Sequence, residues 1–270
     1  MSRAKTPPPD SQHELAKAIT AFSYRHPIYQ TFADFVELAA ISLNAVDLRQ
    51  PWRDNQEAKY MQIVKQYTPE EAQAFCKMLA ILIGALETAT TPGSIGRADI
   101  LGLTYHELEL HNKWTGQYFS PFEICQLMAE MNVGDKEELE AKIAADGFIR
   151  LCEPACGSGA MVIAFALAMR SRGVEPQRHL HVTAVDVDLK CVAMTYIQLS
   201  LLGIPAVIVH GNSLTLEEWG HWYTPAHIMF GWGAKLRRRS NAEPAAQTET
   251  VADEPAILPE IVKATQLSLF

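Results

Sequence analysis

Residues 148–159 read Phe-Ile-Arg-Leu-Cys-Glu-Pro-Ala-Cys-Gly-Ser-Gly, and this stretch decides the fold. Its first five residues are typical of a short buried β-strand. The glycines at 157 and 159 permit a tight turn, and the apolar run over roughly 159–171 predicts a helix behind it. A strand, a glycine loop and a helix in this order begin a βαβ unit. The loop of such a unit lies where doubly wound sheets bind ligands.

The same alternation continues downstream. Residues 181–186 predict a second strand, 189–202 a second helix and 206–210 a third strand. Residues 226–230, Ala-His-Ile-Met-Phe, fit a fourth strand. Strands that alternate with helices predict a parallel sheet with right-handed crossovers, and therefore an α/β fold.

The segment upstream has a helical pattern from about 11 to 112. Its clearest helix begins at Thr68-Pro69-Glu70-Glu71, where Thr68 suits the N-cap, proline the first position and Glu71 a capping box. Thr90-Thr91-Pro92-Gly93 ends it. Apolar residues at helical spacing predict one buried stripe, which comprises Phe75, Leu79, Leu82, Ile83 and Leu86. A small packing domain is the plainer interpretation, and a DNA-contacting helical domain is the alternative.

Composition bounds the class of protein. The chain has 270 residues, of which 48% are hydrophobic, so it can bury one sizeable core. Its formal net charge of −8 argues against a protein that coats nucleic acid by bulk attraction. Five scattered cysteines suit a reducing cytosol, and their spacing predicts no metal site. No apolar run reaches about 18 residues, so we expect a soluble cytoplasmic protein without a membrane partner.

Domain boundaries follow from shifts in composition. Pro7-Pro8-Pro9 marks residues 1–10 as a disordered tail. We expect a helical N-terminal domain over 11–112 and a ligand-binding α/β domain over 113–239. After Arg239 the chain is rich in Ala, Glu, Pro and Thr, which predicts a flexible segment over 240–270.

The 153–159 loop does not fit the common nucleotide motifs. A nicotinamide fingerprint requires a third glycine where this chain has Val162. A P-loop requires a Lys-Ser/Thr pair, and Glu153 would repel phosphates. Asp186 ends the second strand, where a carboxylate can accept hydrogen bonds from ribose hydroxyls. The alternatives are that Asp186 is a solvated loop acid and that Asp188 caps the next helix.

Two further segments suit ligand contacts. Residues 211–214 read Gly-Asn-Ser-Leu, and the Asn212 amide can bond the edge of an adenine ring, or else form an ordinary turn. Residues 116–121 read Gly-Gln-Tyr-Phe-Ser-Pro. Ser120 suits an N-cap, Pro121 the first helical position and Glu123 a capping box, and such a helix opening can hold a carboxylate.

These four segments together resemble one family. Glu-Pro-Ala-Cys-Gly-Ser-Gly is similar to the Asp-Pro-Ala-Cys-Gly-Ser-Gly loop of the modification subunits of type I restriction systems and related adenine-N6 DNA methyltransferases. The segments at 116–121, 185–188 and 211–214 resemble the family's other motifs, in the family's order. The resemblance covers roughly 112–234. It implies a Rossmann-like S-adenosylmethionine methyltransferase fold, with a truncated sheet, preceded by the helical domain.

The resemblance implies roles for particular residues. Phe119, Ser120 and Pro121 would hold the methionine end of S-adenosylmethionine. Asp186 would bind the ribose, and Asn212, where the family usually has Asp, the adenine. The loop would wrap the centre of the cofactor, and its implied binding residues are Glu153, Pro154, Ala155, Cys156, Gly157 and Gly159.

The family's catalytic tetrapeptide, Asn/Asp-Pro-Pro-Tyr/Phe, does not follow the expected fourth strand. There the chain has Gly231-Trp232-Gly233-Ala234, in which Trp232 could stack on a flipped base but Gly231 offers no acceptor. The nearest proline lies in Tyr223-Thr224-Pro225-Ala226. The catalytic residues are therefore unknown. Residues 235–239, Lys-Leu-Arg-Arg-Arg, could touch a phosphate backbone or form a solvated helix end.

The peptide at 266–270 reads Gln-Leu-Ser-Leu-Phe. It resembles the Gln-Leu-x-Leu-Phe peptide by which bacterial proteins bind the DNA polymerase sliding clamp. Gln266 would anchor by polar contacts, and Leu267, Leu269 and Phe270 by burial in the clamp. The alternative is a tail that folds back on the core.

The leading hypothesis is an adenine-N6 DNA methyltransferase-like protein that binds S-adenosylmethionine and is recruited to DNA by the clamp. The second is a catalytically inactive adaptor or anti-restriction protein that keeps the cofactor pocket. A nicotinamide oxidoreductase is a distant third. A partner chain that completes the sheet is a further possibility.

Overall fold

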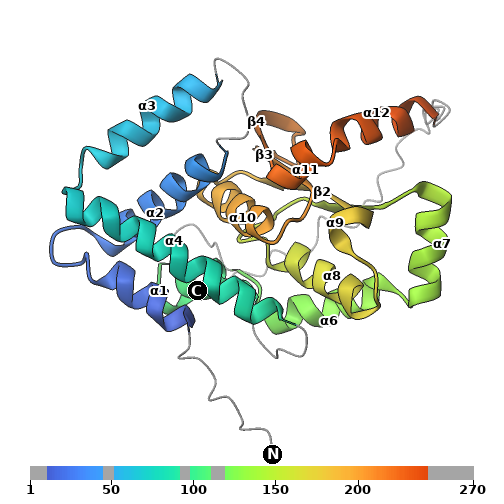
Figure 1. Ribbon diagram of the computed structural model, residues 1–270, viewed down its shortest axis with the longest axis horizontal. Coiled ribbons are helices and arrows are strands. Elements are labelled where there is room, and N and C mark those ends of the chain that lie inside the picture. Colours follow the sequence, from blue (N-terminus) through green and yellow to red (C-terminus); the bar gives the residue numbers. More distant parts are fainter. Residues whose placement is uncertain (1–10, 45–51, 92–97, 111–118, 243–270) are drawn as a thin grey trace, which may run out of the picture. The chain divides into compact units, whose positions relative to one another are not determined.

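The computed structural model describes residues 11–44, 52–91, 98–110 and 119–242 (Figure 1). The chain divides into two compact units, Met1–Gly233 and Ala234–Phe270. The predicted tail at 1–10, most of the segment at 240–270 and the clamp-like peptide at 266–270 lie outside the described residues.

The N-terminal part of the first unit is helical, as predicted. Its helices are α1 (Ser11–Thr20), α2 (Ile28–Leu43), α3 (Trp52–Val64), α4 (Pro69–Thr90) and α5 (Ile100–Glu107). The capping box of α4 is confirmed, because Thr68 Oγ1 accepts from Glu71 N at 3.3 Å and Glu71 Oε2 accepts from Thr68 N at 2.8 Å.

The predicted buried stripe of α4 is wrong at one residue, Ile83. Phe75, Leu82 and Leu86 are buried, but Ile83 is 43% exposed. It follows Leu82 by one residue, which turns its side chain about 100° round the helix and away from the core. By length and composition alone, α4 is also apolar enough to cross a membrane, a test that core helices of soluble proteins pass too.

The α/β part begins with two helices, α6 (Phe122–Val133) and α7 (Lys136–Asp146). Strand β1 (Ile149–Glu153), helix α8 (Ala160–Ser171), the short α9 (Pro176–His179), strand β2 (Leu180–Asp186), helix α10 (Leu189–Leu201) and strand β3 (Ala206–Asn212) follow. These elements confirm the predicted alternation to within two residues at the ends of each.

The sheet has the order β1-β2-β3-β4. The first three strands are parallel, with Glu153 opposite Ala184 and Asp186 opposite His210. Strand β4 (Glu217–Tyr223) pairs antiparallel with β3, so that Tyr223 lies opposite Val207. The expectation of an all-parallel sheet is therefore wrong for β4, which returns directly from β3 in a hairpin.

The predicted fourth strand at 226–230 is also wrong. Residues Pro225–Met229 form helix α11. Thr224 is its N-cap, with Oγ1 accepting from His227 N at 3.4 Å, and Pro225 occupies the first turn. The proline ring fixes a helical φ at Pro225, and Thr224 caps the helix. These two signals outweigh the apolar run at 226–230 that suggested a strand. Helix α12 (Trp232–Ala242) follows.

One hydrophobic core joins the helical and the α/β parts of the first unit. Helix α2 packs along α10 and α6 lies beside α8 (Figure 1). Buried residues of both parts belong to the same cluster, for example Phe32, Leu82, Val182 and Ile197. A buried hydrogen bond from Tyr196 Oη to Asn44 Oδ1, at 3.0 Å, crosses the same contact. The helices therefore form a wall of the α/β core.

Candidate functional site

A cavity of about 570 Å³ opens at the carboxyl ends of β1 and β2. This volume is within the range of ordinary small-molecule sites. Its lining comes from the start of α6, the loop after β1, the start of α8 and the end of β2, and comprises Phe119, Ser120, Cys125, Glu153, Ala155, Cys156, Gly157, Ser158, Ala160, Met161, Asp186, Val187 and Asp188.

The glycine loop is held by the end of β2. Asp186 Oδ2 accepts from Gly157 N, and Asp186 Oδ1 from Asp188 N, both at 2.9 Å. Cys156 N donates to Val185 O at 2.9 Å. Gly157 has a φ of +54°, and a Cβ there would meet the Phe119 ring at 3.0 Å. The loop therefore needs glycine both for its backbone and for its close approach to the ring.

The buried carboxylate of Asp99 also holds the glycine loop in place. Asp99, the N-cap of α5, accepts from Ser158 Oγ at 2.6 Å and from Gln198 Nε2 at 2.8 Å. Gln198 Nε2 also donates to Ser158 O at 2.8 Å, and Asp99 Oδ1 accepts from Gly102 N at 3.0 Å. Burial raises the pKa of Asp99, and the hydrogen bonds from Ser158, Gln198 and Gly102 oppose that rise.

This network was missed from the sequence. The signal for the cap was present, since Asp99 precedes the apolar run Ile100-Leu101. Nothing in the sequence links Asp99 to Ser158, which is 59 residues away.

The lining is acidic. Burial raises the pKa of the Glu153 carboxyl, and the nearby Asp186 charge adds to that rise, while a hydrogen bond from Ala155 N opposes it. Asp188 forms an ion pair with Lys190, whose Nζ lies 3.1 Å from Asp188 Oδ2 and 3.2 Å from the Tyr29 hydroxyl. Because the Lys190 side chain is only 11% exposed, this pair is held in place beside the cavity.

Two thiols line the cavity. Burial raises the pKa of Cys125 to about 11 and that of Cys156 to about 12. Both are therefore neutral at physiological pH, and they contribute apolar surface instead of nucleophiles.

The structure brings most of the predicted cofactor residues together. Phe119, Ser120, Glu153, Ala155, Cys156, Gly157 and Asp186 line the cavity. Pro154, Gly159 and Pro121 lie in the adjoining backbone, where Gly159 is the N-cap of α8 with a φ of +94°.

Two local predictions differ from the structure. Helix α6 begins at Phe122 with Pro121 as its N-cap and no side-chain cap bond, so the predicted Ser120 capping box is wrong. Proline as N-cap shifts the helix start by one residue. Asn212 is not among the lining residues, and its Oδ1 accepts from Leu214 N at 2.9 Å and Thr215 N at 3.4 Å. The alternative of an ordinary turn describes this contact.

The segment after β4 lies at the other end of the sheet. Because Tyr223 pairs with Val207 at the start of β3, Thr224 to Gly231 continue at the amino ends of the parallel strands. Trp232 is fully buried there, with ring centroids 5.0 Å from Phe148 and 5.2 Å from His181. Its indole is therefore in the core and does not stack on a base.

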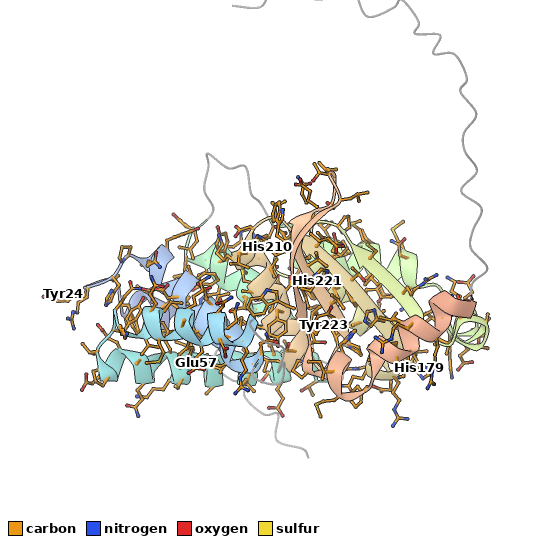
Figure 2. All side chains as sticks on the ribbon, turned by 90° about the horizontal axis from the view of Figure 1, so that it is seen from above. Tyr24, Glu57, His179, His210, His221 and Tyr223 are labelled. Carbon is orange, nitrogen blue, oxygen red and sulfur yellow. The ribbon has the colours of Figure 1, made fainter. Side chains whose placement is uncertain are left out.

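The β3–β4 hairpin presents a row of aromatic side chains. Figure 2 shows His210, His221 and Tyr223 spaced along its two strands. The His210 ring packs edge-on against Trp219 at 5.0 Å, and His221 stacks with Tyr223 at 6.4 Å. Leu214 and Leu216 near the turn are exposed.

Comparison with known proteins places part of this chain. Residues 98–231 match the family model of N-6 DNA methylases. A search of curated proteins found no match. Among solved structures, the chain is similar to a Listeria monocytogenes protein described as a class I S-adenosylmethionine-dependent methyltransferase, with 14% identity, 82% of this chain and 68% of that chain covered, and a TM-score of 0.40.

A second similar structure is the type I restriction-modification system methyltransferase subunit from Streptococcus thermophilus. It shares 16% identity over 77% of this chain, with a TM-score of 0.37. The chain spans 40% of that subunit's length. All residues that line the cavity lie between 119 and 188, inside the matched segment. The cavity therefore lies in the part of the chain that is similar to N-6 DNA methylases.

Proposed function

We propose that the chain binds S-adenosylmethionine in the cavity at the carboxyl ends of β1 and β2 and transfers its methyl group to the N6 amine of adenine in DNA. The amine gains the methyl group and loses a proton, and S-adenosylhomocysteine leaves. The observation that carries this proposal is the Asp186-held glycine loop within the N-6 DNA methylase segment.

The cavity fits the charge of this cofactor. S-adenosylmethionine carries a sulfonium and an ammonium against one carboxylate, so it is a net cation. The lining offers the carboxylates of Glu153 and Asp186, in addition to Asp188, whose charge already pairs with Lys190; the first two favour a cation and disfavour the phosphates of a dinucleotide. Phe119 and Met161 add apolar surface for the uncharged parts of the ligand.

The proposed roles follow the positions of the residues. Asp186 would accept from the ribose hydroxyls in addition to its two main-chain partners, because each carboxylate oxygen has two lone pairs. Phe119 and Ser120 would hold the methionine end, with Pro121 behind them. Asn212 would approach the adenine through Nδ2, since its Oδ1 is engaged by the turn.

Calorimetry tests the cofactor site. We expect heat of binding with S-adenosylmethionine and a loss of at least tenfold in affinity for Asp186→Ala. Glu175→Ala is the matched control, because Glu175 precedes α9 without a side-chain cap bond and is not among the cavity residues. The absence of binding heat with the parent protein would end the proposal.

A non-catalytic function is the second candidate. The described segment 224–231 lies at the opposite end of the sheet from the cavity, and it lacks the family's tetrapeptide. An adaptor or anti-restriction protein would keep the cofactor site for stability or regulation, or a partner chain would supply the acceptor group. Sequencing that detects N6-methyladenine in DNA from cells expressing the protein, and not in cells without it, rejects the inactive form.

We further propose recruitment to cytoplasmic DNA by the sliding clamp through Gln266, Leu267, Leu269 and Phe270. Each apolar anchor contributes roughly 1.5–3 kcal/mol on burial, of which ordering the peptide removes part, so a micromolar affinity is expected. A pull-down of the clamp should be lost when Leu269 and Phe270 are deleted. Clamp retained by the deleted protein would refute this assignment.

A local basic segment is the second proposed contact to DNA. Helix α12 carries Lys235, Arg237, Arg238 and Arg239 in a chain that is acidic overall. Cations clustered on one short helix favour a phosphate backbone and give a salt-dependent affinity. Replacing Arg237 and Arg238 with Ala should weaken DNA binding at low salt and flatten its salt dependence.

A further inference from the structure

Lys190 is a largely buried cation beside the proposed cofactor cavity. Its side chain is 11% exposed, and its Nζ lies 3.1 Å from Oδ2 of Asp188, which lines the cavity. Burial by itself would lower the pKa of Lys190. The charge of Asp188 and the hydrogen bonds with Tyr29 and Asp188 instead raise that pKa above the usual value of a lysine, so the amine stays protonated. Because taking a charged amine out of water costs free energy, its position calls for a reason.

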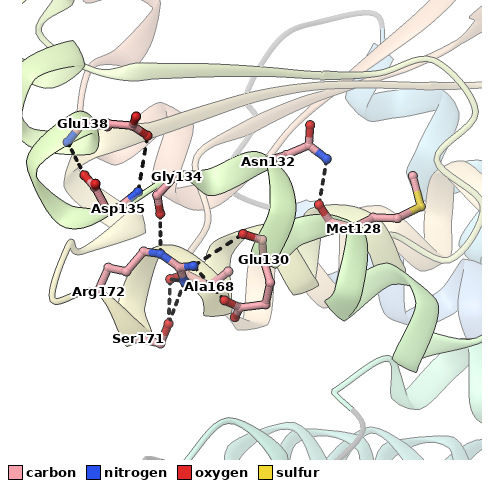
Figure 3. Close-up of polar contacts among 9 residues, drawn as sticks. All are labelled: Met128, Glu130, Asn132, Gly134, Asp135, Glu138, Ala168, Ser171 and Arg172. Atoms are coloured by element: carbon pink, nitrogen blue, oxygen red, sulfur yellow. Dashed lines mark hydrogen bonds and ion pairs between the residues drawn. The ribbon is translucent and has the colours of Figure 1, made fainter.

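The stability of helix α10 does not supply that reason. Lys190 is the second residue of α10, where the helix macrodipole disfavours a cation. Arg172 shows the favourable arrangement, because it is the C-cap of α8 and donates to Ala168 O at 3.1 Å in the last turn (Figure 3). Arg172 also donates to Glu130 Oε2 at 2.7 Å and so ties α8 to α6. Lys190 lies at the opposite, unfavourable end of its helix.

Two tyrosines of the N-terminal helices hold Lys190 in place. Its Nζ lies 5.1 Å from the ring centroid of Tyr29 on α2 and 5.4 Å from that of Tyr105 on α5, distances at which an aromatic ring attracts a cation. The Tyr29 hydroxyl accepts a hydrogen bond from Nζ at 3.2 Å. The Tyr105 ring also packs on Phe119, which lines the cavity, with 5.0 Å between centroids. The N-terminal helices therefore fix a cation beside the cavity.

A fixed charge at this place bears on the one difference in charge between the cofactor and its product. S-adenosylmethionine carries a sulfonium, whereas S-adenosylhomocysteine has a neutral thioether sulfur at the same position. The ammonium and the carboxylate are common to both molecules. The ratio of the two affinities therefore measures the electrostatic potential at the sulfur, which carboxylates make favourable for the sulfonium and cations make unfavourable.

We infer that Lys190 sets how strongly the cavity prefers S-adenosylmethionine to S-adenosylhomocysteine. It neutralises Asp188 and leaves Glu153 and Asp186 as the carboxylates that favour the sulfonium. The product then competes with the cofactor more effectively than it would in a cavity with three uncompensated carboxylates, so methylation becomes sensitive to the ratio of cofactor to product. Lys190 acts through Asp188 and is a positioning residue. This inference rests on the proposed cofactor site.

Calorimetry of both ligands with charge variants of the full chain tests the inference. Lys190→Met keeps the apolar stem between the two rings and removes the charge, which leaves Asp188 uncompensated. The ratio of the dissociation constant of S-adenosylhomocysteine to that of S-adenosylmethionine should rise about fivefold at low salt. Lys190→Arg keeps the charge and should keep this ratio within twofold of the parent value.

Asp188→Asn shifts the charge balance in the other direction, and it tests the inference even where Lys190→Met does not fold. The amide oxygen can still cap α10, as Asp188 Oδ1 does by accepting from Lys190 N at 2.8 Å. The carboxylate charge is lost, so the uncompensated Lys190 cation should lower the ratio about fivefold. The double variant, which carries neither charge, should return to within twofold of the parent ratio.

The outcomes separate a role of charge from a structural role. A purely structural Lys190 would make each single variant lose affinity for both ligands by equal factors. A ratio that stays at the parent value in Lys190→Met and Asp188→Asn overturns the inference, while a parent protein that binds neither ligand rejects the cofactor site itself. Lys136→Met is the matched control for net charge. Lys136 also lies in the first turn of its helix, pairs with Glu140 and is not among the cavity residues, so the ratio should not change.

Discussion

The two ends of the parallel strands satisfy their polar groups in different ways. At the carboxyl ends, the Asp186 and Asp99 carboxylates accept from main-chain amides and side chains of the glycine loop and its neighbours. At the amino ends, His181 and His227 share a buried hydrogen bond of 2.9 Å, and His181 packs on Trp232. The first end surrounds a cavity, whereas the second is packed with rings.

The difference teaches which end can bind a ligand. Carboxylates with lone pairs to spare beside a cavity can accept further hydrogen bonds. The neutral His181 imidazole, packed against the His227 and Trp232 rings, has little capacity for a ligand, and it specifies the core. Changes at the amino end should therefore affect stability alone, and changes at the carboxyl end should affect both stability and binding.

Trp232→Ala should give the largest effect. Removing a fully buried indole that packs on Phe148 and His181 should lower the free energy of unfolding by about 3–5 kcal/mol. Urea titration measures this loss. Cofactor affinity of the folded variant should stay within twofold of the parent, and a tenfold loss would show that the two ends are coupled.

Lowering the pH should give the second-largest effect, a loss of folding stability through His181 at the amino ends of the strands. Burial, with a further contribution from the His227 charge, lowers the pKa of His181 to about 4, whereas an unfolded histidine titrates near 6.5. The unfolded state therefore binds more protons between these values. This contribution to stability is fully present above about pH 6.5 and falls by up to about 3 kcal/mol as the pH drops toward 4.

His181→Gln checks the assignment. Its free energy of unfolding should depend less steeply on pH between 6.5 and 4 than that of the parent protein. His221→Gln, which removes a partly exposed imidazole on β4, should keep the parent's slope. Equal slopes for His181→Gln and the parent would rule out His181 as the source.

Asp99→Asn, at the carboxyl ends of the strands, should lower both the free energy of unfolding and the affinity for S-adenosylmethionine. An amide has one acceptor oxygen, so either the Ser158 hydroxyl or the Gln198 and Gly102 N–H groups lose their acceptor, at a cost of about 2 kcal/mol. Because Ser158 lies in the cofactor loop, affinity for S-adenosylmethionine should fall about tenfold. Calorimetry and urea titration on one sample measure both; unchanged affinity would make Asp99 purely structural.

Thr68→Ala should give the smallest effect. It removes the cap of α4, far from both ends in the sequence, and should lower stability by about 1 kcal/mol. Cofactor affinity and the pH slope should not change. A change in cofactor affinity or in the pH slope would show that a loss of stability alone alters these two measurements. The effects measured for the other variants would then have to be corrected by the change seen in Thr68→Ala.

The sequence predicted those helices and strands that have clear local signals, such as capping residues or bounded apolar runs. The capping residues Thr68 and Asp188 lie where predicted, and the strands before Glu153 and Asp186 are confirmed, because apolar runs bounded by turn residues define them. Strand β4 was not predicted, since Glu217–Tyr223 reads Glu-Glu-Trp-Gly-His-Trp-Tyr, begins with two glutamates, is exposed over its first three residues, and lacks apolar alternation.

Contacts between residues far apart in the sequence were the main feature that could not be predicted. Asp99, Gln198 and Lys190 depend on contacts between residues tens of positions apart or more, which local patterns do not encode. The residues predicted from the family's motifs mostly share one cavity, but their roles stay predictions.

The hydrogen bonds to Asp186 also give a way to observe local opening of the glycine loop. Opening the loop breaks the bond from the Gly157 amide to Asp186 Oδ2, whereas the Asp188 amide bonds the other oxygen, Oδ1, between residues only two apart. Hydrogen exchange of the Gly157 amide should therefore report loop opening, and a ligand that needs the closed loop should slow it more than it slows the Asp188 amide. The ratio of the two exchange rates would then measure occupancy without a label on the ligand.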